Sequence, residues 1–477
     1  MPAGPEAGSV RGFSEEGVAA LHASLDGLLA PWDAELAARY PGDDGSRQPV
    51  HTVYVPGDRY AAGLAPEWAA QAREAVDGAG GVRRLVDLLG VGEGAGGDLA
   101  DAVAERVSAK LAVEAIEDLR IDFEDGFGDR GDAAEDAAVI AAARELVRAE
   151  AQGTATPFAG IRIKCLEEAT RRRGVRTLAL FVAELVAGRA AAGEARALPD
   201  GFVVTLAKVT APQQVEAMAR ACEHVEDANG LEPGTLRFEV QVETPQALLA
   251  ADGTATVARL VHAAPGRVTA LHYGTYDYSA SLGIAAAYQS MEHPAADHAK
   301  SVMQLAVAGT GVRLSDGSTN VLPVGDPQAV DAAWRLHGRL VRRSLERGYY
   351  QGWDLHPAQL PSRFAATYAF YREGAASALA RLAAYVGFVP DAGGVLDEPA
   401  TAKAMAWFLG RGVDCGALTE TEVRTATGLD RAGLDAVRVS GRAPQPLCLI
   451  RICEPTSPAE LSDAVVWGDE SGGGGGG

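Results

Sequence analysis

Eight short strand-like segments recur along this chain, and the helical patterns between them limit the folds that it can adopt. We place the strands at residues 51–55, 119–125, 159–165, 202–209, 236–243, 268–273, 320–324 and 349–355. Strands that alternate with helices form parallel sheets, because each helix carries the chain back to the start of the next strand. Eight such units are the number that closes a (β/α)8 barrel. We therefore predict an α/β fold of the TIM-barrel class.

Several of the expected strands carry charge along one face. In LRIDFED (119–125), Arg120, Asp122 and Glu124 alternate with apolar residues, and RFEVQVE (237–243) repeats the pattern. A parallel strand that is apolar on both faces would read as a continuous hydrophobic run. Burying an unpaired charge costs several kcal/mol, so inward-facing charges must pair with each other, with a metal or with substrate. The alternation predicts a barrel whose interior is lined with charged groups.

Two carboxylates follow neighbouring strands in the stretch 236–283. Glu243 ends the fifth expected strand, and Asp277 lies in the Gly-flanked turn after the sixth. The carboxyl ends of parallel strands meet at one edge, where barrels place their chemistry. Two hard oxygen ligands with room for water suit Mg²⁺ or Mn²⁺. The alternative is that Glu243 forms a structural ion pair with Arg162 or Lys208.

Charge and composition exclude several classes of partner. The chain has 477 residues, of which 47% are hydrophobic and 22% charged, and its formal net charge is −21. This acidity disfavours nucleic acid and anionic membranes as general partners. The N-terminus lacks the features of a signal peptide, and no apolar run reaches the ~18 residues of a transmembrane helix. The five cysteines show neither metal-ligand spacing nor a disulfide framework, so we expect a cytoplasmic protein.

The pattern of elements also divides the chain. We expect an N-terminal helical segment at 1–48 and a barrel catalytic domain at 49–365. After the barrel we expect a mainly helical extension at 366–466 and a disordered Gly-rich tail at 467–477. The extension carries no independent catalytic motif, so we expect a lid, an oligomerisation element or a small helical domain there.

Seven short motifs stand in a fixed order at the ends of the expected strands. They are VYVPGDR (53–59), DFEDGF (122–127), IRIK (161–164), LAKV (206–209), QVET (241–244), YGTYDYSASLG (273–283) and GWDLHPAQ (352–359). In this order they resemble the HpcH/HpaI aldolase and citrate lyase β-subunit family, which includes malyl-CoA-type lyases. The resemblance covers roughly residues 50–365 and marks the chain as a divergent member. Gly126 stands where the family usually has Ser, and Lys164 where it usually has Asn.

The resemblance implies roles for the charged residues at these strand ends. Glu243 and Asp277 would bind the divalent cation. Arg162 would hold the substrate carboxylate or the developing oxyanion, because its planar fork suits bidentate binding. Glu124 and Asp125 would orient metal-bound water and Arg162. The alternative is that Arg162 only forms a structural pair with Glu124 or Asp125.

Five further residues are candidates at the same edge. The backbone N–H groups of Gly274 and Thr275 would bind the carboxylate of a 2-oxo acid. Lys208 would assist electrostatically or serve as a buried counter-ion. Asp354 would act as an acid or base near the mouth or be a solvated loop carboxylate, and Arg59 would contact a phosphate or the distal end of the substrate.

The implied function is a metal-dependent carbon–carbon lyase of the aldolase or citrate and malyl-CoA lyase type. It would cleave or form a C–C bond through a metal-stabilised enolate of a 2-oxo acid or a thioester. We expect a small 2-oxo acid or hydroxy acid substrate, or a CoA thioester, and by analogy with related barrels a homo-oligomer. The alternatives are another enzyme that handles phosphoenolpyruvate or pyruvate, and a non-catalytic barrel used for binding or assembly.

Overall fold

The chain forms an eight-stranded parallel barrel. A computed structural model describes residues 14–92, 97–389 and 397–442. The hydrogen-bonded strand order is β7-β6-β5-β4-β3-β2-β1-β8, and a parallel bridge between Ser315 and Gln351 joins the two ends. The strands are β1 (His51–Pro56), β2 (Asp118–Asp122), β3 (Phe158–Ile163), β4 (Val203–Leu206), β5 (Arg237–Val242), β6 (Val268–Tyr273), β7 (Arg313–Ser315) and β8 (Gly352–Asp354). The predicted TIM-barrel class is confirmed.

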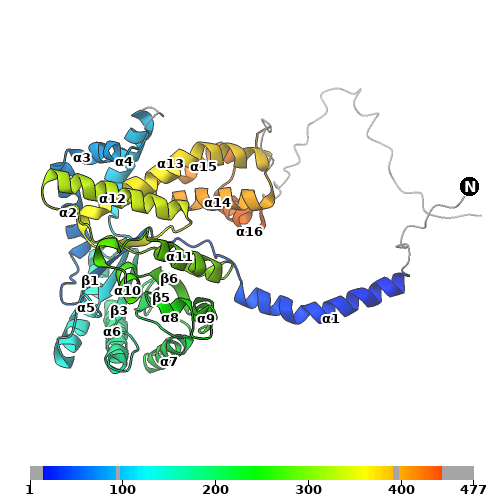
Figure 1. Ribbon diagram of the computed structural model, residues 1–477, viewed down its shortest axis with the longest axis horizontal. Helices are drawn as coiled ribbons and strands as arrows, with labels where there is room; N and C mark the ends of the chain where they lie inside the picture. Colours follow the sequence, from blue (N-terminus) through cyan, green and yellow to red (C-terminus); the bar gives the residue numbers. More distant parts are fainter. Residues whose placement is uncertain (1–13, 93–96, 390–396, 443–477) are drawn as a thin grey trace, which may run out of the picture.

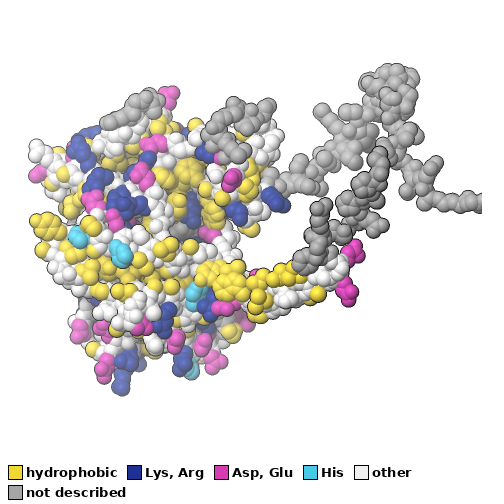
Figure 2. All heavy atoms as spheres, turned by 45° about the vertical axis from the view of Figure 1, so that its right-hand side comes forward, with side chains coloured by type: hydrophobic (Ala, Val, Ile, Leu, Met, Phe, Trp, Pro, Cys, Tyr) yellow, Lys and Arg dark blue, Asp and Glu magenta, His cyan; other side chains and the backbone are white. Residues whose placement is uncertain are grey.

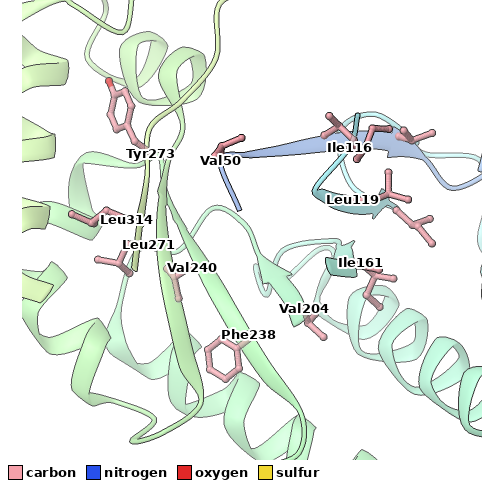
Figure 3. Close-up of a cluster of buried hydrophobic side chains, with 14 of the residues drawn as sticks. Val50, Ile116, Leu119, Ile161, Val204, Phe238, Val240, Leu271, Tyr273 and Leu314 are labelled. Atoms are coloured by element: carbon pink, nitrogen blue, oxygen red, sulfur yellow. The ribbon is translucent and has the colours of Figure 1, made fainter. Parts of the chain in front are cut away.

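Helices surround the barrel and cover the apolar faces of its strands. The alternation places Ile161, Val204, Val240 and Leu271 outward, and all four are fully buried under the helices (Figure 3). The helices that connect or cover the strands are α2 (Leu64–Gly78), α3 (Gly81–Leu88), α4 (Gly97–Val113), α5 (Asp132–Gln152), α6 (Arg171–Ala192), α7 (Pro212–Ala228), α8 (Pro245–Leu248), α9 (Thr256–His262), α10 (Thr275–Ser281), α11 (Pro294–Val307) and α12 (Pro327–Glu346).

Charged side chains fill the inside of the barrel, as the strand alternation predicts. Arg120 donates to Glu239 through Nε (3.0 Å) and Nη2 (2.8 Å), and it also pairs with Asp118. His272 Nε2 lies 3.1 Å from Glu239 Oε2, while Trp353 donates to His272 Nδ1. Burial alone would raise the pKa of Glu239, but Arg120 and His272 outweigh it and hold this pKa below its usual range. The interior is therefore a paired polar core.

The seventh strand lies earlier in the chain than the sequence predicts. The expected strand at 320–324 has no strand structure, and β7 is the three-residue segment Arg313–Ser315 instead. The apolar residues of NVLPV (320–324) led to the wrong prediction of a strand there. Pro323 argues against a strand, because proline has no backbone N–H to donate to a neighbouring strand. The true strand is too short to show an alternation, and it is recognised by its pairing with β6 and by the bridge from Ser315 to Gln351.

A second helical layer packs on the barrel. It consists of α13 (Leu360–Tyr385), α14 (Pro399–Asp414), α15 (Glu420–Thr427) and α16 (Arg431–Ser440). Figure 1 shows this layer with α12 on the side away from α5–α7. Residues 360–369 are all buried, so α13 crosses the expected boundary at 365/366 without a break. The expected Gly-rich tail at 467–477 lies outside the described residues.

The helix α1 (Glu15–Arg39) begins at the N-cap Ser14 and projects away from the rest of the molecule (Figure 1). It is the main described element of the expected N-terminal segment. Within the three described ranges, no helix combines the length and apolar character needed to cross a membrane.

Candidate active site

Charged residues from four neighbouring strands converge at the carboxyl-terminal mouth of the barrel. They come from the ends of β2, β3, β4 and β5, and the helix α10 after β6 adds Asp277. Most of the charged residues that the sequence analysis singles out lie in this cluster. Asp354 and Arg59 do not share its contacts.

Arg162 is held at the centre of the mouth by Asp122. Arg162 donates from Nε to Asp122 Oδ1 (2.7 Å) and from Nη2 to Asp122 Oδ2 (2.6 Å), and its guanidinium lies over the Tyr54 ring. Burial works against the charged form, yet Asp122 keeps the pKa of Arg162 well above its usual value. The Nη1 atom is 3.8 Å from Glu124 Oε2. The Nη1 edge of the fixed Arg162 guanidinium therefore faces the loop after β2 (residues 123–128), which carries Glu124 and Asp125. We call this segment the acidic loop.

Asp122 is the site residue that the sequence analysis did not select. Its carboxylate also accepts hydrogen bonds from the backbone N–H groups of Glu124 (2.9 Å) and Gly126 (2.8 Å). A Cβ at position 126 would lie 2.5 Å from Asp122 Oδ2, so the loop requires glycine there. The available signal was the alternation, which places Asp122 on the same inward face as Arg120 and Glu124.

Lys208 links the acidic loop to Glu243. Its Nζ lies 2.6 Å from both Glu124 Oε1 and Asp125 Oδ1, and its backbone N–H donates to Glu243 Oε1 (2.8 Å). Among the described residues, Lys208 is the only non-glycine with a positive φ, at 53°. A left-handed conformation costs a non-glycine residue about 1–2 kcal/mol, so the surrounding contacts must impose this backbone. The lysine is thus both a counter-ion and a strained connector.

Glu243 is a buried carboxyl group that faces another acid. It is 2% exposed, and burial followed by the charge of Asp277 raises its pKa to about 8. A Cβ at position 274 would lie 2.6 Å from Glu243 Oε2, so Gly274 allows the close approach of the two strands. A divalent cation between Glu243 and Asp277 would remove the repulsion that raises this pKa.

The donor set fits a hard divalent cation. Glu243 and Asp277 offer only oxygen atoms, the ligand type of Mg²⁺ and Mn²⁺. Among the described residues there is no cluster of three or more His, Cys, Asp or Glu side chains arranged to hold a metal. Two protein carboxylates would leave the remaining positions of an octahedral ion to water and substrate oxygens.

The structure corrects the prediction for Gly274. The Gly274 N–H donates to Val242 O (3.1 Å) as part of the strand pairing. It is therefore not available to a substrate carboxylate. Thr275 is buried at the start of α10, and its hydroxyl accepts a hydrogen bond from the Ser318 N–H (3.3 Å). Of the predicted pair, only the Thr275 backbone remains a candidate.

The structure also argues against Asp354 as an acid or base. Asp354 is fully buried and accepts hydrogen bonds from Arg363, the closest at 2.8 Å. His51 Nδ1 and His337 Nε2 lie 3.2 Å and 3.0 Å from its two oxygens. Burial would raise the pKa of Asp354, but Arg363 and the two histidines hold it well below its usual value. The group is a structural anion at the contact between the barrel and α13.

Two other observations limit the site. Ser362, His337 and Asp354 follow each other in the order of a catalytic triad, with Ser362 Oγ 2.8 Å from His337 Nδ1 and His337 Nε2 3.0 Å from Asp354 Oδ1. All three are buried, so a substrate cannot reach them.

Arg59 is exposed on the loop after β1, and its side chain has no hydrogen bond or ion pair with another described residue.

Comparisons with known proteins agree with this fold. A family model described as "Domain of unknown function (DUF6986)" matches residues 29–441. No curated protein matches the sequence. A solved citrate lyase from Burkholderia xenovorans LB400 is 17% identical, with a TM-score of 0.51, over 81% of this chain and 98% of its own. The resemblance to the citrate lyase β-subunit family is thereby confirmed at the level of the fold.

Two further solved structures are similar at lower scores. A malate synthase from Haloferax volcanii, in a ternary complex with pyruvate and acetyl-CoA, is 17% identical over 57% of this chain and 66% of its own, with a TM-score of 0.40. A citrate lyase β-subunit from M. tuberculosis, with oxaloacetate and magnesium, is 17% identical over 68% of this chain and 98% of its own, with a TM-score of 0.37.

Proposed function

The chain belongs to the family described as a domain of unknown function (DUF6986), and we propose that it is a divalent-cation-dependent carbon–carbon lyase or synthase. The observation that carries this proposal is the pairing of two opposite features at one barrel mouth. Glu243 is a buried carboxyl group with a pKa raised to about 8 beside Asp277, which calls for a cation. Arg162 is a charged fork held in place by Asp122, which calls for an anion. The citrate lyase fold supports the same reaction class.

In this proposal Glu243 and Asp277 hold the cation, Mg²⁺ or Mn²⁺. When bound there, the cation would draw electron density from a substrate carbonyl oxygen and lower the energy of the adjacent enolate. The backbone N–H of Lys208 donates to Glu243 Oε1 (2.8 Å), so the other carboxylate oxygen, Oε2, would be the one to bind the cation.

Arg162 binds the carboxylate of the substrate and sets its orientation. Because Asp122 occupies Nε and Nη2, the free Nη1 edge beside Glu124 receives the anion. Cleavage of the C–C bond leaves its electron pair on the carbon next to the carbonyl group. The fixed positive charge of Arg162 stabilises that developing negative charge without reorganisation.

Glu124 is the carboxyl group best placed to exchange a proton with substrate. Burial raises its pKa although Arg162 and Lys208 act in the opposite direction. Lys208 and Asp125 hold it in position. These contacts support a small 2-oxo acid or hydroxy acid, free or as a thioester, as the proposed substrate class.

The exchange of the pyruvate methyl protons with deuterium tests this proposal, because exchange requires the enolate and no second substrate. We expect Mg²⁺-dependent exchange with the whole chain and a loss of at least ~100-fold in Glu243→Gln. Glu168→Gln makes the same charge change on an exposed loop residue and should exchange normally. A Glu243→Gln variant with full exchange and unchanged Mg²⁺ affinity would refute the metal assignment.

A further inference from the structure

The helix α1 has a continuous apolar stripe that nothing in the described structure covers. Its residues at helical spacing include Leu21, Leu25, Leu28, Trp32 and Leu36, which share one face. They are between 43% and 73% exposed, and α1 buries no residue at all. Figure 2 shows hydrophobic side chains along the projecting helix α1, which we call the arm. A monomeric soluble protein rarely exposes an apolar surface of this length.

A large cavity lies at the opposite end of the barrel from the candidate active site. It has a volume of about 1200 Å³. We call it the base cavity. The first residues of six strands line it, namely Asp118, Phe158, Val203, Arg237, Val268 and Arg313. Leu198, Phe202, Leu231 and Val261 add apolar surface. The base cavity therefore offers the mixed apolar and polar surface that a docking helix needs.

The arm and the base cavity adjoin each other, but the arm points away from its own barrel. Ala38 and Arg39 in the last turn of α1 line the cavity. The next residues are fixed, because Tyr40 packs against His262 and the Gly42 N–H donates to Gly309 O (2.8 Å). These anchors fix the last turn of α1 at the edge of the cavity, and none of the stripe residues lines the cavity of its own chain.

The apolar stripe could be covered by another α1 helix or by a base cavity. The charges on these surfaces distinguish between the two. The helix α1 has five carboxylates, Glu15, Glu16, Asp26, Asp33 and Glu35, and one arginine. Two α1 helices packed against each other would bring like charges together. Apart from Arg39 of α1 itself, the wall of the base cavity instead holds five arginines and five carboxylates. Arg313 has its nearest carboxylate 3.9 Å away, and Arg237 forms no ion pair with a described residue. The base cavity is the more complementary surface.

We propose that α1 docks its apolar stripe across the base cavity of a second copy of this chain. The same chain carries both surfaces, so two copies exchange their helices about a two-fold axis and each surface is covered once. The arrangement is closed, because no further copy is needed. The active-site mouths stay open at the far ends of the two barrels, so this proposal does not depend on the proposed function.

The mass of the whole chain in solution tests the proposal. We expect sedimentation equilibrium to give twice the mass of one chain, and the triple variant Leu25→Glu, Leu28→Glu, Trp32→Glu to give the mass of one. The control, Ala19→Glu, Ala23→Glu, Ala34→Glu, adds the same charge to the opposite face of α1 and should remain a dimer. Since α1 buries no residue, the circular dichroism of both variants should match the parent. A monomeric parent, or a dimeric apolar-face variant, would overturn the proposal.

Cross-linking between two chains that each carry one added cysteine identifies the surface that α1 covers. Leu28→Cys lies on the arm, and Thr235→Cys lies on the exposed rim of the base cavity. We expect a bis-maleimide to join the chains when the two variants are mixed and to join neither variant alone above the parent level. Cross-linking of Leu28→Cys by itself would show that two arms pair with each other, and would refute docking on the base cavity.

Discussion

At the scale of single residues, the arrangement of the barrel mouth depends on which carboxylate each positively charged side chain binds. Arg162 is bound by Asp122 through two hydrogen bonds, whereas Glu124 and Asp125 are held by Lys208. The division leaves Arg162 oriented with one free edge. It leaves Glu243 with no cationic side chain within ion-pair distance among the described residues, so burial and the charge of Asp277 raise its pKa. Both outcomes follow from the order of the strands around the mouth.

Asp122→Asn should remove the anchor of Arg162 without changing the size of the side chain. Breaking a buried ion pair costs roughly 3–5 kcal/mol when one charge is left uncompensated. Because Nη1 of Arg162 still lies 3.8 Å from Glu124 Oε2, the loss should be at the lower end of that range. We expect kcat for the C–C bond reaction to fall about 100-fold. Urea unfolding and steady-state kinetics measure the two effects, and unchanged kcat would contradict the positioning role.

The stability of the cation-free protein should fall as pH rises, because the pKa of Glu243 is about 8 in the folded chain against an ordinary 4.5. Between these values the folded chain holds a proton that the unfolded chain has lost. The free energy of unfolding should therefore decrease by up to ~1.4 kcal/mol per pH unit in this window. Mg²⁺ competes with that proton, so its affinity should rise with pH up to about 8.

Urea unfolding between about pH 5 and 9 checks this prediction. Glu243→Gln is the control, since other groups such as Glu124 also have a raised pKa. The difference between parent and variant isolates Glu243. A difference that does not change with pH, or that grows in favour of the parent as pH rises, would contradict the assignment.

At the scale of elements, the loop between β2 and α5 is held by the strand next to it. Lys164 follows β3 and donates to Phe123 O (2.8 Å) and Gly128 O (2.9 Å), and its Nζ is 2.8 Å from Glu135 Oε2. These three contacts span the loop that carries Glu124 and Asp125. The residue that departs from the family pattern at this position is thus a brace for the acidic loop.

Lys164→Met should loosen the acidic loop while leaving the barrel folded. The variant keeps the apolar stem and removes the three contacts of Nζ, so the backbone on both sides of Glu124 is held less firmly. We expect kcat/KM to fall about 10-fold, with a loss of ~1–3 kcal/mol in stability from the two loop carbonyl groups that lose their donor. Glu135 keeps its contacts with Arg173 and Thr177. Lys164→Arg should recover part of the activity. Steady-state kinetics and amide hydrogen exchange test this prediction. If Lys164 only braces the loop, exchange should become faster at residues 123–128 alone, whereas a general loss of stability would raise exchange throughout the barrel.

At the scale of the whole molecule, Asp354 joins the barrel to its helical layer. It ends β8 and is surrounded by Arg363 from α13, His337 from α12 and His51 from β1. Three separate elements therefore meet at one buried anion. The helical layer and the barrel should unfold together, because neither can bury these groups alone.

Asp354→Asn should destabilise the whole chain by roughly 3–5 kcal/mol, since Arg363 would stay buried without its anion. The variant that still folds should retain its kcat and its pH profile, because Asp354 lies outside the mouth. Urea unfolding followed by two probes, one in the barrel and one in α14, measures the loss and its cooperativity. A variant with normal stability and a displaced pH profile would show that Asp354 titrates during the reaction after all.

The sequence by itself determined the barrel and the positions of most of its charged site residues. Both are local properties: strands alternate with helices, and inward and outward side chains alternate within each strand. Glu243 and Asp277 could be placed at one edge because the carboxyl ends of parallel strands share it. The alternation also places Arg120 and Glu239 inside the barrel, where the cost of burying an unpaired charge requires that each has a partner. In the structure they pair with each other.

Only the tertiary structure decided which group meets which. Asp122 rather than Glu124 or Asp125 holds Arg162, because β2 and β3 align Asp122 beside it. Asp354 is a buried anion because α12 and α13 cover it, and β7 is defined by its pairing with β6. The projection of α1 depends on the anchors at Tyr40 and Gly42. Each depends on contacts between residues distant in the chain, which periodicity along the sequence does not encode.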